Sequence, residues 1–162
     1  MELILIETLI LCIIFTFFAF CLSLNPIKTL YNYPPKIRKK VLKMKEYKDK
    51  IPTTENKIIA KMVASMLIVT IVSLILRYIN GITEFKEAFC ISFFIWTIVN
   101  IYDALVIDII WFCHSKKVRI KGTEKMDEEY KDYMFHIKES IKGEIIGAIV
   151  CIVIALIIKF ML

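Results

Sequence analysis

Apolar residues concentrate in four long stretches that are separated by polar segments. These stretches cover residues 3–24, 58–79, 88–113 and 143–161. A helix needs about 20 such residues to cross the hydrocarbon core of a bilayer, and open strands cannot cross it with unpaired backbone groups. The pattern therefore predicts an all-α chain, folded as one integral membrane four-helix bundle over residues 1–162.

The distribution of Lys and Arg predicts how the helices are oriented. Segment 25–57 holds ten of these residues and segment 114–142 holds eight, whereas the turn over residues 80–87 holds only Lys86. Basic loops stay on the cytoplasmic side. We therefore expect a multi-pass protein of the cell (inner) membrane, with both long segments cytoplasmic and both termini outside. The first stretch has no basic start and no small-residue cleavage site, which favours a retained helix over a signal peptide.

Composition narrows the class of protein. The 162 residues are 58% hydrophobic with a mean hydropathy of +0.66, which is well above the usual content of soluble domains. The net charge of +6 equals the charge of residues 36–50 alone, where eight basic residues face Glu46 and Asp49. The basicity is local, so we expect no nucleic acid partner. The abundance of Ile and Lys is typical of an AT-rich bacterial source.

The basic segment predicts a first amphipathic loop helix. Ile37, Val41, Met44 and Tyr47 recur at helical spacing. Such a helix lies on a membrane surface with its apolar stripe in the acyl boundary. The expected contacts with anionic inner-leaflet headgroups are made by five basic residues: Lys36, Arg38, Lys39, Lys40 and Lys43.

A second amphipathic helix is predicted over residues 127–142. Its apolar stripe comprises Tyr130, Tyr133, Met134, Ile137 and Ile141. Beside that stripe, at 100° per residue, lies a cluster of titratable side chains: Glu129, Asp132, His136 and Glu139. The offset between His136 and Glu139 occurs in some carboxylate–histidine metal sites. Acids in the first turn of a helix are also stabilised by the helix dipole, which explains the same residues without a functional site. A site for a divalent metal cofactor is therefore one of two alternatives.

The third stretch carries polar residues inside the membrane: Asn100, Asp103 and Asp108. An intramembrane carboxylate needs a partner, a wet cavity or a proton, and it is a candidate functional group for that reason. In an α-helix Asn100 shares the face of Asp103, whereas Asp108 points about 140° away from Asp103. The two acids then need two separate polar environments, or a helix that is buried on most sides, and Lys61 lies at a plausible depth to pair with Asp108.

A catalytic constellation is the alternative use of these groups. If residues 127–142 fold back under the bundle, four side chains converge at its cytoplasmic face: Asp108, His114, His136 and Glu139. These residue types suit acid–base chemistry or a metal ion.

Small residues on the fourth stretch predict a helix–helix contact. They recur every fourth position, at Gly143, Gly147, Cys151 and Ala155, which lets two backbones approach closely. The contact is either internal or between copies in a homo-oligomer or a larger membrane complex.

Three functions follow from these features. The first is a transport-type or ion-handling protein, or a subunit of one, with Asn100, Asp103 and Asp108 lining its polar path. The second is a membrane-embedded enzyme that acts at the cytoplasmic face. The third is a non-catalytic scaffold or assembly subunit.

Overall fold

The computed structural model describes residues 1–161, apart from the side chains at positions 54, 56, 57, 60 and 61. The chain is 77% helical, and the described residues contain no strand. The long α-helices are α1 (Glu2–Ser23), α3 (Thr54–Leu74), α4 (Phe85–Tyr102) and α6 (Tyr133–Phe160). Two π-helical segments extend α3 and α4, namely η3 (Ile75–Ile79) and η4 (Asp103–Phe112). The short elements are η1 (Leu30–Asn32), α2 (Pro35–Leu42), η2 (Lys45–Tyr47), η5 (Lys116–Val118) and α5 (Asp127–Tyr130).

Four helical stretches are long and apolar enough to cross a membrane. They are Glu2–Ser23, Met62–Ile79, Phe85–Phe112 and Asp127–Phe160. Only described residues enter this assignment, and at most 28% of the most apolar window of any of the four is buried, so most of their apolar side chains face outward, as in helices that contact lipid or other protein. The predicted all-α class with four candidate membrane spans is confirmed.

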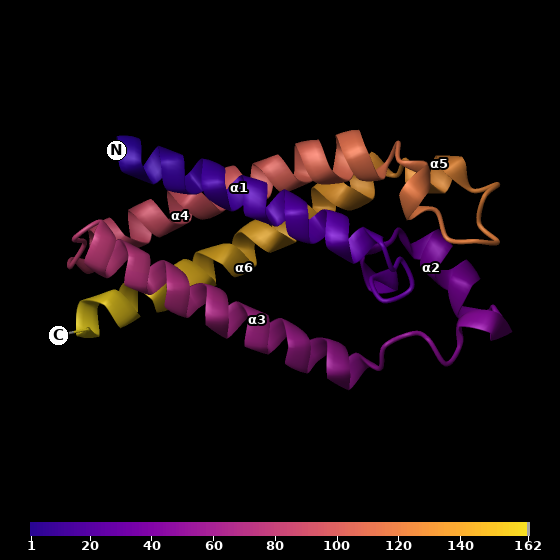
Figure 1. Ribbon diagram of the computed structural model, residues 1–162, viewed down its shortest axis with the longest axis horizontal. Coiled ribbons are helices and arrows are strands. Elements are labelled where there is room, and N and C mark those ends of the chain that lie inside the picture. Colours follow the sequence, from indigo (N-terminus) through magenta and orange to yellow (C-terminus); the bar gives the residue numbers. More distant parts are fainter. Residues whose placement is uncertain (162) are drawn as a thin grey trace.

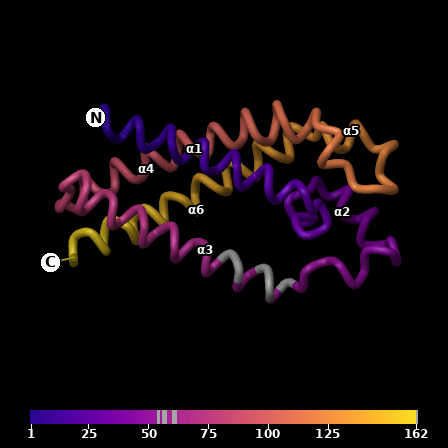
Figure 2. Tube along the Cα trace, in the orientation of Figure 1, coloured from indigo at the N-terminus to yellow at the C-terminus, as the bar shows by residue number. Residues whose placement is uncertain are grey.

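The long helices extend along one axis of the molecule (Figure 1). Both termini lie at one end, and α2 and α5 lie at the other, as the chain trace in Figure 2 shows. Near the termini, α1, α3, α4 and α6 share an apolar core that includes Ile4, Leu76, Ile95 and Ile154. At the opposite end the polar segments fold into a small domain-like unit, which we call the cap (residues 26–51 and 112–130).

The cap has an apolar core of its own. This core includes the buried side chains of Ile27, Leu30, Tyr33, Ile37, Val41, Tyr47, Ile120 and Tyr130. Ile37 and Val41 are fully buried there, so the stripe of the first loop helix packs on protein. The expectation that this stripe enters the acyl boundary is wrong, because Tyr33, Ile120 and Tyr130 cover it.

The second loop helix also differs from the prediction. It breaks after α5, and α6 begins at Tyr133 with the Asp132 carboxylate accepting a hydrogen bond from the Phe135 N–H (3.0 Å). The predicted stripe divides at this break, since Tyr130 is buried in the cap while the other members, Tyr133, Met134, Ile137 and Ile141, are exposed. From Tyr133 on, α6 is one helix of 28 residues, or about 42 Å. It exceeds the hydrocarbon core of about 30 Å.

Helices α4 and α6 form the most extensive contact between long helices. The row of small residues lies in it: a Cβ on Gly147 would stand 1.8 Å from the Trp96 indole nitrogen, and one on Gly143 would stand 3.2 Å from Asn100 Oδ1. Cys151 and Ala155 are buried further along α6. The missing side chain at position 147 therefore makes room for the Trp96 ring, and this seam holds η4 beside the start of α6.

Candidate functional site

A cavity of about 840 Å³ opens beneath the cap. Its walls come from α1, the segment after α1, α2, η4 and the first turns of α6. The size falls within the range of ligand-binding pockets. The lining from α1 is largely apolar and includes Phe15, Phe18 and Leu22, whereas the lining from η4 and α6 carries acids and His136 among apolar side chains. A contact between Thr16 Oγ1 and Tyr102 Oη (2.8 Å) ties α1 to α4 beside this cavity.

A contact between a histidine and a carboxylate joins two helices at the cavity. His136 Nδ1 is 3.0 Å from Asp108 Oδ2. The His136 side chain is only 3% exposed, whereas that of Asp108 is 28% exposed. A carboxylate on Nδ1 orients the ring and favours a proton on that nitrogen.

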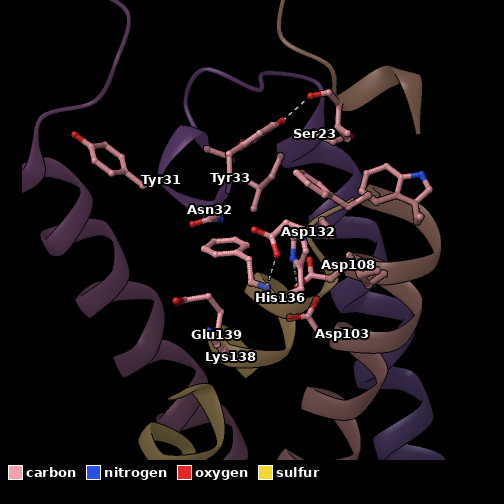
Figure 3. Close-up of a pocket in the computed structure, with 18 of the residues that line it drawn as sticks. Ser23, Tyr31, Asn32, Tyr33, Asp103, Asp108, Asp132, His136, Lys138 and Glu139 are labelled. Atoms are coloured by element: carbon pink, nitrogen blue, oxygen red, sulfur yellow. Dashed lines mark hydrogen bonds and ion pairs between the residues drawn. The ribbon is translucent and has the colours of Figure 1, made fainter. Parts of the chain in front are cut away.

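The imidazole of His136 is held by aromatic rings. The rings of Phe112 and Phe135 both lie edge-on at 5.2 Å from it. By geometry, His136 Nε2 is buried without a hydrogen-bond partner among the described residues, and the buried Cys113 side chain interacts with the same ring. Figure 3 shows Asp103 and Asp108 projecting from η4 toward His136.

The π-helical geometry of η4 explains this arrangement. Its ten residues begin at Asp103, and the Cys113 N–H donates to the Asp108 carbonyl (3.0 Å), a bond that spans five residues. In a π-helix, residues five apart follow one another along one side, and such segments often occur at functional sites. Asp103 and Asp108 therefore line the same cavity. The predicted separation of 140° is wrong because it assumed α-helical geometry.

Asn100 belongs to a different polar group. Its amide donates to Glu144 Oε2 (2.7 Å) and to the Ser140 carbonyl (3.1 Å), and Thr97 donates to Glu144 Oε1 (2.5 Å). Asn100 thus bonds to α6 and makes no hydrogen bond to Asp103. Glu144 is not among the residues predicted from the sequence, although an acid directly before the apolar run 145–158 indicates a polar group at the end of a span.

Of the other predicted residues, Glu139 lines the cavity and pairs with Lys142 (2.6 Å). His114 does not join it. It is exposed, its Nδ1 lies 3.0 Å from the Ile109 carbonyl, and its ring stacks on Tyr133 at 6.2 Å. The predicted convergence thus holds for Asp108, His136 and Glu139 and fails for His114, because the helix ends at Phe112 and the chain turns away.

Glu129 is separated from the acids of α6 because the helix breaks after α5, and it lines a smaller pocket with Pro34 and Lys36. Arg38 lines the main cavity, whereas Lys36, Lys39, Lys40 and Lys43 are exposed. The predicted partner of Asp108, Lys61, has a side chain outside the described residues. Within the described part, His136 fills that role.

Among the described residues, no three His, Cys, Asp or Glu side chains are grouped so that they could hold a metal ion. Comparisons with protein-family models, curated proteins and solved structures return no match for this chain.

Proposed function

We propose that the chain is a membrane-embedded enzyme whose Asp108–His136 pair acts as a general base on a substrate bound in the cavity. The observation that carries this proposal is the position of the buried His136 imidazole, which is held by the Asp108 carboxylate at Nδ1 and belongs to the lining of a cavity that also contains Asp103.

The chemistry of this pair is proton transfer. Nε2 takes a proton from a substrate hydroxyl or a water molecule, and the Asp108 carboxylate orients the ring and stabilises the imidazolium that forms. Asp103 supplies a second carboxyl group on the same wall. It can return a proton to the leaving group when it is protonated.

The location of the cavity supports a reaction at a membrane surface. The first turns of α6 extend beyond the length that a hydrocarbon core requires, and His136 lies in them. The Lys and Arg excess of the cap segments favours a cytoplasmic position by the positive-inside rule. The proposal therefore includes a bacterial inner membrane, with the cap on the cytoplasmic side and exposed lysines of α2 at anionic headgroups.

Lipid turnover in nanodiscs tests the proposal. Purified protein is incubated in nanodiscs made from a bacterial lipid extract, and the lipids and added water-soluble acceptors are followed by mass spectrometry. We expect at least one species to be converted. The His136→Asn variant should lower its rate by about 10²–10⁴-fold, the usual contribution of a general base.

His114→Asn is the matched control, because His114 is the other histidine of the chain and lies outside the cavity. It should retain the wild-type rate. Circular dichroism melting of both variants separates loss of activity from loss of folding. Equal rates for wild type and a folded His136→Asn variant would overturn the proposal, and so would the absence of any conversion by the wild type.

A second candidate is the transport-type function, which one observation favours. The Thr97–Asn100–Glu144 group lies between α4 and α6, further from the cap than Asp103. Together with Asp103 and Asp108 it places acids at successive depths. Proton flux into proteoliposomes discriminates between the two functions. Transport requires a flux that Asp103→Asn and Glu144→Gln abolish, whereas the enzyme requires no flux and tolerates Glu144→Gln.

A further inference from the structure

The cavity has two chemically different walls. Phe18 and Leu22 of α1 line it while remaining 60% and 56% exposed on the apolar surface of the helix. In a bilayer this surface is covered by acyl chains. The cavity is therefore continuous with the lipid phase along α1, whereas the lining from η4 and α6 combines apolar side chains with all four acids, His136 and two lysines, once Asp132 at the start of α6 is included. A molecule that contacts both walls must be an amphiphile.

The charges of the cavity show which headgroup it suits. The acids are Asp103, Asp108, Asp132 and Glu139, and the bases besides His136 are Arg38, Lys138 and Lys142. Three acids are engaged: Asp108 by His136, Glu139 by Lys142, and Asp132 by the Phe135 N–H.

Two cations of the lining remain without a partner. Within the described residues, Arg38 and Lys138 make no ion pair or side-chain hydrogen bond, and Asp103 is the one acid of the lining in the same position. Arg38 is half-buried. A guanidinium offers a planar set of donors that matches phosphate or carboxylate in a bidentate way. A half-buried one without a partner is therefore a site for an anionic group.

We infer that the cavity binds a membrane amphiphile with a phosphate headgroup, with the phosphate at Arg38 and the chain along Phe18 and Leu22. This inference rests on the proposed function and adds the substrate class to it. It places the headgroup within the same cavity as the Asp108–His136 pair, so that the bond to be attacked lies in the polar part of the lipid.

Quenching of Trp111 measures this binding directly. The chain has two tryptophans, Trp96 and Trp111, and only Trp111 lines the cavity. A Trp96→Phe background therefore reports on the site alone. The probe is a brominated dodecyl phosphate, added to protein in nanodiscs of neutral phosphatidylcholine. We expect saturable quenching, and weaker quenching by a brominated dodecyl maltoside, which has the same chain but no charge.

Variants at neighbouring positions of α2 identify the headgroup contact. Arg38→Gln should raise the half-saturating concentration of the alkyl phosphate about tenfold or more, and Arg38→Lys should give an intermediate value, because lysine keeps the charge without the bidentate geometry. Lys39→Gln removes the same charge from an exposed neighbour outside the cavity and should change the value less than twofold. Equal effects at positions 38 and 39 would reduce the result to surface attraction and overturn the inference.

Competition with inorganic phosphate separates the two sources of this headgroup chemistry. A lipid site predicts that millimolar inorganic phosphate leaves the quenching by the alkyl phosphate unchanged. Displacement by inorganic phosphate at the concentration of the alkyl phosphate itself would show a free-anion site instead, and would contradict the assignment of a lipid.

The binding assay also separates this inference from the proposed function. His136→Asn should bind the alkyl phosphate normally while losing turnover. If Arg38→Gln binds like the wild type and His136→Asn is inactive, the substrate class is wrong and the enzyme function survives. If Arg38→Gln loses binding and His136→Asn remains active, the lipid site stands and the general-base function falls.

Discussion

The cap and the cavity beneath it place their buried polar groups in different settings. In the cap, the Tyr130 hydroxyl accepts a hydrogen bond from the Ile120 N–H (3.0 Å) and contacts Thr123 Oγ1 (2.7 Å). The Tyr33 hydroxyl donates to the Val118 carbonyl (2.9 Å). These groups bond to one another within a packed apolar core, whereas the paired His136 and Asp108 side chains line a cavity. The difference in setting assigns the cap to the stability of the fold and leaves the cavity as the candidate site.

The electrostatics of the cap agree with its structural role. Burial raises the pKa of Tyr33 well above its usual range, so its hydroxyl keeps the proton that it donates. The Arg119 guanidinium lies 3.9 Å from the centre of the Tyr130 ring and donates to the Cys113 carbonyl (2.9 Å). These contacts tie the segment after η4 to α5 and to Cys113, which directly follows η4 and therefore the turn that carries Asp108.

The largest expected effect is the loss of turnover on replacing Asp108 in the cavity wall. Asp108→Asn removes the carboxylate that orients His136 while changing no volume. We expect turnover in the nanodisc assay to fall by about 10²–10⁴-fold, because the ring loses the favoured tautomer. The melting temperature should shift by only a few degrees. If Asp108→Asn unfolds much of the protein while the folded fraction keeps the wild-type turnover rate, Asp108 has a structural role, like the buried polar groups of the cap.

A smaller effect is expected at the seam that supports both regions. Gly147→Ala places a Cβ 1.8 Å from the Trp96 indole nitrogen, and overpacking of this kind costs about 1–3 kcal/mol. Chemical denaturation in mild detergent measures the loss. Gly143→Ala, whose Cβ would stand 3.2 Å from Asn100 Oδ1, should be milder. If both variants lose the same stability, close packing on Trp96 is not what position 147 provides.

On the cap side, Tyr130→Phe should affect stability and spare activity. It removes the acceptor of the Ile120 N–H and a partner of Thr123 in a fully buried place. Leaving such groups unsatisfied costs about 1–3 kcal/mol. Tyr78→Phe is the control, because Tyr78 is 65% exposed. Loss of turnover in folded Tyr130→Phe protein would show that cap and cavity are not separable.

The smallest effect is expected at the edge of the cavity. Lys142→Ala breaks the ion pair with Glu139. The Lys142 side chain is 66% exposed and that of Glu139 is 49% exposed. Solvent-exposed pairs contribute about 0–1 kcal/mol. We therefore expect almost no change in the free energy of unfolding. A larger loss than that would mean that the Glu139–Lys142 pair belongs to the structural part of the molecule.

The sequence predicts the helices better than it predicts the site. The apolar stretches and the spacing of small residues locate the spans and the Gly147 row, because both depend on residue type alone. The relation between Asp103 and Asp108 could not be predicted, since it depends on whether η4 is α- or π-helical. The contact between His136 and Asp108 needs no fold-back, because His136 lies in the first turn of the continuous helix α6 beside η4, and only tertiary packing decides which helices are neighbours. Glu144 escaped notice because a single acid beside an apolar run resembles a span boundary.

The same limit explains the loop helices. An apolar stripe such as Ile37 and Val41 shows that a surface is covered, but it does not show what covers it. Here Tyr33 and Tyr130, which come from distant parts of the chain, provide a protein surface. A bilayer satisfies the same pattern, so the residue spacing alone could not distinguish the two.

The two histidine rings give the most direct test of the central claim. In ¹⁵N NMR of labelled protein in nanodiscs, His136 should carry a proton on Nδ1 at neutral pH and differ from His114 in its nitrogen shifts, a difference that Asp108→Asn removes. Addition of the alkyl phosphate should shift the His136 nitrogens and leave those of His114 unchanged. If His136 and His114 show the same tautomer distribution and neither responds to the amphiphile, the Asp108–His136 pair is not the acid–base group of a binding cavity.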